Sequence, residues 1–157
     1  MNRQKLDSII NEIVDEGEKV KSKYLEEPTG PVDYLGIFSR DEDEMNAMLS
    51  LMKTEGKFLQ DTPTGPHYML KNPVLTKSGP VSIIKVRKPD SKKPYRGAPD
   101  FLVDDYDSFK KKYLGRKYFN LIDREVFEMI EIWDPEANVL VYFKNMPIAH
   151  VLKDKLS

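Results

Sequence analysis

Apolar residues recur at helical spacing at the start of the chain. Residues three and four apart fall on one face of a helix, and lysines and glutamates fill most of the other positions. The apolar residues of this face are Leu6, Ile9, Ile10, Ile13, Val14 and Val20. The pattern predicts an amphipathic helix over residues 3–24. Two interpretations of its apolar face are open: it packs on its own domain, or it binds a partner. Packing is the ordinary case, because any surface helix has one apolar face.

Beyond a linker at 26–31, short runs rich in apolar and β-branched residues predict strands at 32–38, 67–70 and 81–86. Ser39 and Glu42 have capping-box spacing, so a helix is expected to open at Ser39 and to end at Gly56. Residues 58–59 begin the return of the chain after this helix, and residues 72–80 are expected to separate the strands at 67–70 and 81–86. The buried face of this helix is predicted to be Met45, Met48, Leu49 and Met52.

The second half of the chain repeats this order. Strands are predicted at 100–103, 119–122, 127–133 and 139–143, with a helix after Asp104 or Asp105. The two halves align best with Asp33 over Asp100, which places Tyr34 over Phe101. The buried face of the second helix is predicted to be Tyr106, Phe109, Tyr113 and Leu114. Apolar positions after residue 146 predict a short closing helix.

These elements predict an α+β fold. Two tandem βαβββ units would form one strongly curled mixed sheet, with an added N-terminal helix, in one domain. The expected parts are the N-terminal helix at 1–25, the first unit at 32–88, the second unit at 98–145 and a closing segment at 146–157.

Three short motifs resemble the vicinal oxygen chelate superfamily of glyoxalases and extradiol dioxygenases. They are VDYLGIF at 32–38, GAPDFLVDDYDSF at 97–109 and DPEANVLVYF at 134–143. The layout is closest to the YecM-like branch, which also has an N-terminal helix and a proline-rich basic connection, here KVRKPDSKKPYRG. The resemblance implies that the inner face of the curled sheet forms a cavity for a metal or a ligand.

The resemblance also implies where metal ligands would stand. The first histidine position holds Tyr34, and the second holds Asp100, or Ala98 in a shifted register. The glutamate position of the last strand holds Val141, and that of a middle strand holds Lys85. A lysine ammonium opposes a divalent ion. We therefore expect the fold without a metal site and without a cofactor.

Composition narrows the function classes further. The chain has no cysteine, which excludes thiol catalysis, disulfides and cysteine metal sites. Lys and Arg total 25 and Asp and Glu total 26, so no global field attracts nucleic acid or an anionic membrane. The first twenty residues carry acids throughout and predict no signal peptide, and no apolar run is long enough to span a bilayer. A cytoplasmic monomer or homodimer is expected.

The histidines and a glutamate pair offer little chemistry by themselves. His67 and His150 lie far apart without metal-ligand spacing, so each is expected to be structural or at the surface. Glu128 and Glu131 are three apart on a predicted strand and point to opposite faces, so only one of them can face inward.

Lys85 and Arg87 alternate onto one face of their predicted strand. With Tyr34, Asp100 and Glu131 they form a candidate inward set, and lysine and arginine suit a carboxylate or a phosphate. The other interpretation is the solvent-facing side of an edge strand.

Two function hypotheses follow. The first is a cavity for a small anionic molecule, in a binder or in an enzyme of unassigned reaction. The second is a protein-interaction module that uses the N-terminal helix or the basic connection at 85–96. Tyr95 among these basic residues is also typical of single-strand nucleic-acid binding, although the same composition suits a solvated loop.

Overall fold

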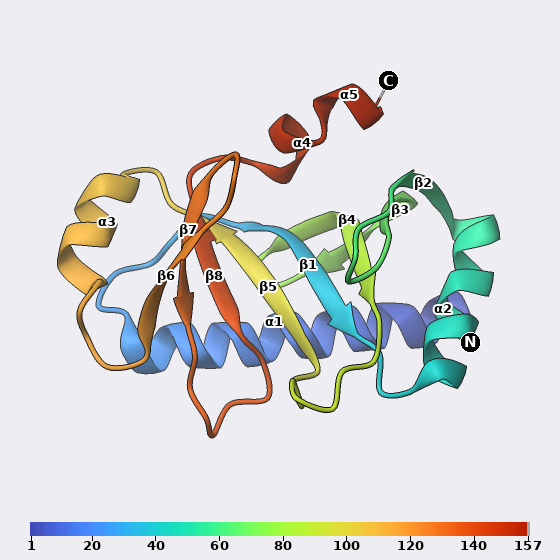
Figure 1. Ribbon diagram of the computed structural model, residues 1–157, viewed down its shortest axis with the longest axis horizontal. Helices are drawn as coiled ribbons and strands as arrows, with labels where there is room; N and C mark the ends of the chain where they lie inside the picture. Colours follow the sequence, from blue (N-terminus) through green and yellow to red (C-terminus); the bar gives the residue numbers. More distant parts are fainter. Residues whose placement is uncertain (157) are drawn as a thin grey trace.

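The computed structural model describes residues 1–156, which form eight strands and five helices (Figure 1). The strands are β1 (Val32–Phe38), β2 (Gly56–Gln60), β3 (His67–Thr76), β4 (Gly79–Arg87), β5 (Gly97–Leu102), β6 (Phe119–Asp123), β7 (Glu128–Ile132) and β8 (Val141–Lys144). The helices are α1 (Arg3–Tyr24), α2 (Glu42–Glu55), α3 (Tyr106–Tyr113), α4 (Ile148–Val151) and α5 (Lys153–Leu156).

All eight strands belong to one mixed, curled sheet in the order β2-β3-β4-β1-β5-β8-β7-β6. From each edge of the sheet inward, the strands follow the same order within their unit, namely second, third, fourth and first. In each unit the first strand runs parallel to the last one, and β1 and β5 meet antiparallel at the centre. The topology therefore confirms the predicted pair of βαβββ units and the added N-terminal helix.

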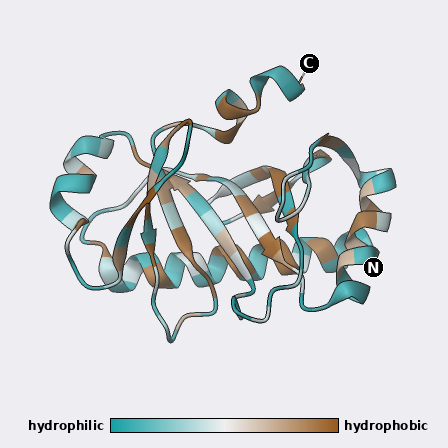
Figure 2. Cartoon of the chain, in the orientation of Figure 1, coloured by the Kyte–Doolittle hydropathy of each residue, from teal (hydrophilic) through white to brown (hydrophobic). Residues whose placement is uncertain are grey.

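Helix α1 forms over the predicted residues because its apolar face meets the sheet. The side chain of Asn2 caps it by accepting a hydrogen bond from the backbone N of Lys5 at 2.8 Å. The helix crosses one face of the sheet and packs on β1, β3, β5 and β8 (Figure 1). The predicted apolar residues are all buried there, so that face is covered by its own sheet. Figure 2 shows hydrophilic and hydrophobic residues together along this helix.

Helices α2 and α3 lie at the two ends of the sheet (Figure 1). The N-cap of α2 is Asp41, whose carboxylate accepts from the backbone N of Glu44 at 2.7 Å, and Glu44 in turn accepts from the backbone N of Arg40. The prediction that Ser39 caps this helix is therefore wrong by two residues. Asp105 caps α3, as predicted.

The strands of the first unit differ from the prediction in length. Strand β3 continues to Thr76 and pairs with β4 through a tight turn, so most of the expected separator at 72–80 is strand. Strand β4 lies between β3 and β1, inside the sheet. The interpretation of Lys85 and Arg87 as one side of an edge strand is therefore wrong.

A β-bulge at Asp33 changes the alignment of the two units. Val32 pairs with Phe101 and Tyr34 pairs with Asp100, so Asp33 is an extra residue on β1. Tyr34 and Asp100 consequently share the face away from α1, whereas Phe101 lies under the ammonium of Lys21 on α1, 3.9 Å from the ring centroid. Tyr34 and Phe101 therefore lie on opposite faces of the sheet, which disagrees with the predicted alignment of Tyr34 over Phe101.

The main core lies between α1 and the sheet and extends under α2 and α3. No helix within residues 1–156 has the length and apolar character that a bilayer crossing requires.

Candidate functional site

The face of the sheet away from α1 is hollowed into a cavity of about 480 Å³. Because side chains alternate along a strand, the residues between the core positions of β1 point into it. Leu35 and Ile37 pack in the core, and Tyr34, Gly36 and Phe38 line the cavity. A volume of this size suits a small organic molecule.

The four central strands form the floor of the cavity. Lys85 and Arg87 come from β4, Tyr34 from β1, Asp100 from β5 and Tyr142 from β8. Gly36 is paired with Lys85 on one side and with Ala98 on the other. The space above Gly36 is taken by the side chain of Arg87 and the ring of Phe38, which lie 3.6 Å and 3.7 Å from where a Cβ would stand.

The rim comes from segments far apart in the sequence. The loop after β2 contributes Thr62 and Thr64, and the β6–β7 hairpin contributes Arg124 and Phe127. Helix α4 and the residue after it contribute apolar side chains, namely Ile148, Val151 and Leu152. The backbone N of Ile148 donates to Oδ2 of Asp33 at 2.6 Å, which ties this closing segment to the floor.

Four of the five candidate residues meet in this cavity, namely Tyr34, Lys85, Arg87 and Asp100. Glu131 lies outside its lining. Asp100 pairs with Tyr142, and Tyr142 pairs with Glu131 on β7, so Tyr142 stands between the two acids along the sheet. Glu131 instead accepts a hydrogen bond from the side-chain amide of Asn120 at 3.3 Å.

Lys144 is the main residue that the sequence analysis missed. It is 0% exposed, and its Nζ lies 3.2 Å from Oδ2 of Asp33 and 3.3 Å from Oδ2 of Asp100. The ammonium also lies over the Tyr34 ring, 4.6 Å from its centroid. Alternation from Tyr142 would have placed Lys144 on the cavity face, but the predicted strand ended one residue too early.

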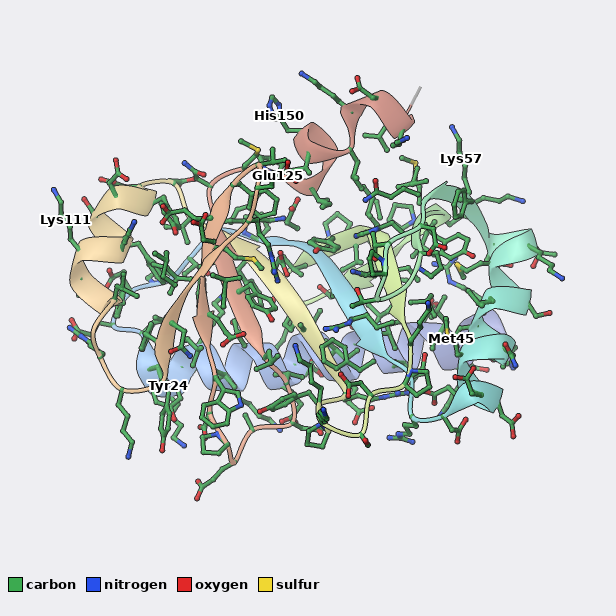
Figure 3. All side chains as sticks on the ribbon, in the orientation of Figure 1. Tyr24, Met45, Lys57, Lys111, Glu125 and His150 are labelled. Atoms are coloured by element: carbon green, nitrogen blue, oxygen red, sulfur yellow. The ribbon has the colours of Figure 1, made fainter. Side chains whose placement is uncertain are left out.

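The histidines differ in their surroundings. His67 is buried, lines the cavity and lies with its ring centroid 5.9 Å from that of Tyr34. Its pKa is lowered to about 4 by burial and by the charges of Lys85 and Lys144, so the imidazole is neutral at pH 7. His150 is exposed on α4 and lies on the outer side of that helix (Figure 3).

Burial and charge also shift the other titratable groups of the floor. Burial raises the pKa of Asp100 to about 6, although the nearby Lys144 opposes the rise. Burial and then the charges of Arg87 and Arg124 lower the pKa of Lys85 to about 8. Burial holds the pKa of the Tyr34 phenol well above its usual range.

The cations of the cavity fall into two groups. Lys144 has two carboxylate partners. Among residues 1–156, Lys85, Arg87 and Arg124 form no ion pair, although all three line the cavity. The guanidinium of Arg87 instead lies over the Phe38 ring, 4.3 Å from its centroid. The cavity therefore carries an excess of positive charge.

The residues present do not fit the divalent metal that the fold resemblance implies. Within residues 1–156, no group of three or more histidine, cysteine or carboxylate side chains is arranged to hold an ion. Both carboxylates of the floor already contact the ammonium of Lys144, and a second ammonium, that of Lys85, faces the same space. Two lysine charges oppose a divalent cation there.

Comparison with known proteins supports the fold. No protein-family model matches the sequence, and no curated protein is similar to it. A solved structure described as a structural-genomics target, Protein EC4020, matches with a TM-score of 0.68 at 10% identity, over 96% of this chain and 92% of that one. This similarity shows a shared fold.

A second solved structure is a glyoxalase/bleomycin resistance protein/dioxygenase superfamily member from Vibrio splendidus 12B01. It matches with a TM-score of 0.44 at 8% identity, over 70% of this chain and 93% of that one. The paired βαβββ topology of the sheet is the arrangement that the resemblance to the vicinal oxygen chelate superfamily implied. The resemblance to the YecM-like branch stays a prediction.

Proposed function

We propose that the protein binds a small organic anion, a carboxylate or a phosphate ester, in the cavity of its curled sheet. The observation that carries the proposal is the convergence of Lys85, Arg87 and Arg124 on one cavity without ion-pair partners among residues 1–156. Leaving cations unpaired in a partly enclosed space is unfavourable, and an anion held there interacts more strongly than in water. We expect the protein to act in the cytoplasm, as a monomer or a homodimer.

The lining also suits an apolar group attached to the anionic group of the ligand. Apolar side chains from the hairpin and from the closing segment face the charged floor, and Phe127, Met129 and Leu152 are among them. A ligand with a charged head and an apolar remainder would match both sides of the cavity.

The interaction-module hypothesis has less support. The apolar face of α1 is buried in the core, so it offers no surface to a partner. In the basic connection, Arg96 is buried and its guanidinium lies 2.6 Å from the Glu44 carboxylate. Lys88, Lys92 and Lys93 of this segment are exposed and suit a solvated loop.

The proposal is tested by thermal denaturation with a panel of organic acids and phosphate esters. We expect a rise in melting temperature that saturates with ligand concentration. Lys85→Met should weaken binding roughly tenfold or more, because it removes a charge-assisted contact. Lys57→Met is the matched control, since Lys57 is exposed on edge strand β2 and is not among the residues that line the cavity.

The proposal is wrong if no compound of the panel raises the melting temperature. It is also wrong if stabilisation is the same in Lys85→Met as in Lys57→Met. Circular dichroism of each variant without ligand establishes that it is folded.

A further inference from the structure

Two lysines stand on the central strands below the cavity, but only Lys85 is among the residues that line it. Lys144 is completely buried, and its Nζ contacts the carboxylates of Asp33 and Asp100. Lys85 lies on β4 between His67 of β3 and Gly36 of β1, and it has no carboxylate partner among the described residues. Its side chain lines the cavity.

The neighbours of Lys85 favour its neutral form. Arg87 follows two residues later on the same strand face, and Arg124 faces the same cavity from the hairpin. These two charges and burial lower the pKa of Lys85 to about 8, so an appreciable fraction of the amine is unprotonated near neutral pH. A lysine beside another cation in a desolvated pocket is a nucleophile toward carbonyl carbon.

The same neighbours provide what a carbonyl substrate needs. The guanidinium groups of Arg87 and Arg124 are suited to a carboxylate. Asp100 lies on the floor, across β1 from Lys85, and its pKa of about 6 allows it both to accept and to donate a proton near neutral pH.

We propose that Lys85 forms an imine with the carbonyl group of an oxo acid whose carboxylate is bound by Arg87 and Arg124. This inference rests on the proposed function, because it names the class of anion and adds a covalent step at the same site.

The step balances without an oxidant or a reductant. The lone pair of the Lys85 nitrogen attacks the carbonyl carbon, and the carbonyl π electrons move to oxygen. One amine proton passes to that oxygen, with Asp100 as the carrier, and a carbinolamine results. The second amine proton follows by the same route, the C–O bond breaks, and water leaves as the C=N bond forms.

The test uses the full chain and reductive trapping. The protein is incubated with pyruvate or 4-methyl-2-oxopentanoate and sodium cyanoborohydride, and the adduct is located by intact mass and peptide mapping. We expect one adduct per chain, at Lys85, with a yield that saturates with the oxo acid. Lactate and 2-hydroxy-4-methylpentanoate share the carboxylate but lack the carbonyl, so they should form no adduct and should suppress trapping.

Two variants separate the site from general lysine reactivity. Lys85→Arg keeps the charge and should lose the adduct, and Lys57→Arg should keep it. An adduct spread over surface lysines, an adduct at Lys144, or one that persists unchanged in Lys85→Arg overturns the imine.

The outcomes also separate this inference from the proposed function. If the hydroxy acids and oxo acids both raise the melting temperature but no adduct forms, the imine is wrong and the anion site stands. If none of these acids is bound or trapped, and the wider panel of anions also fails, both proposals are wrong.

Discussion

Replacing Lys144 by methionine tests whether the buried ammonium balances the two carboxylates of the floor. The change keeps an unbranched side chain of similar shape, one atom shorter, and removes a charge whose Nζ lies 3.2 Å from Asp33 and 3.3 Å from Asp100. Removing one partner of a buried ion pair typically costs about 3–5 kcal/mol, since the remaining charge stays desolvated. We expect a loss of this size in the free energy of unfolding at pH 8.

The loss should depend on pH in a defined direction. The pKa of Asp100 rises from 3.8 to about 6 on folding, so its favourable contribution is complete below pH 4 and disappears as pH rises through about 6. Lys144 opposes this rise, and its removal should raise the pKa of Asp100 further. The folded variant then binds a proton at higher pH than the wild type, and its deficit should shrink between pH 8 and pH 5.

Urea denaturation followed by circular dichroism at pH 5 and pH 8 measures both effects. The double variant Lys144→Met with Asp100→Asn should regain part of the stability at pH 8, because only Asp33 is then left without a partner. A deficit below about 1 kcal/mol at pH 8, within the range of an exposed ion pair, would refute the reasoning. An equal deficit at both pH values would refute it as well.

Two further predictions concern His67 and metal content. The pKa of His67 falls from 6.5 to about 4 on folding, so its contribution is complete above pH 6.5 and disappears as pH falls through 4. Between pH 7 and pH 4 the wild type should therefore lose about 3 kcal/mol more than His67→Gln, and equal losses by urea denaturation would contradict the assignment. Because Lys85 and Lys144 oppose a divalent ion, elemental analysis of the purified protein should find far less than stoichiometric zinc, iron, manganese or nickel. Stoichiometric metal that is lost in Asp100→Asn would show this prediction to be wrong.

Helix α1 could be predicted from the sequence because its periodicity alone determines which face is buried. The bounds of β1 were also correct, since an apolar run ends at the polar stretch after Phe38. The cap of α2 was wrong because Ser39 and Asp41 each stand three residues before a glutamate. Only the structure shows that Glu44 closes the turn through the backbone N of Arg40, which favours Asp41.

For the cavity, the sequence predicted only which residues of one strand share a face. Alternation placed Lys85 and Arg87 together, and both line the cavity. It could not reveal the bulge at Asp33, because one extra residue in a strand leaves no periodic signal. The burial of His67 depends on contacts that join segments far apart in the chain, and the sequence pattern does not contain them.

The two units divide their charges unequally, and this inequality is the physical basis of the proposed anion binding. Strands β4 and β8 hold equivalent places in the sheet, and each carries a lysine, Lys85 and Lys144. The bulge lies at Asp33, and the carboxylates of Asp33 and Asp100 both contact the Lys144 ammonium. Lys85 has no such partner among residues 1–156, and the two arginines that accompany it add charge of the same sign. Because Asp33 and Asp100 both pair with Lys144, the positive charges around Lys85 are not balanced by a carboxylate among the described residues. An anionic ligand would balance them.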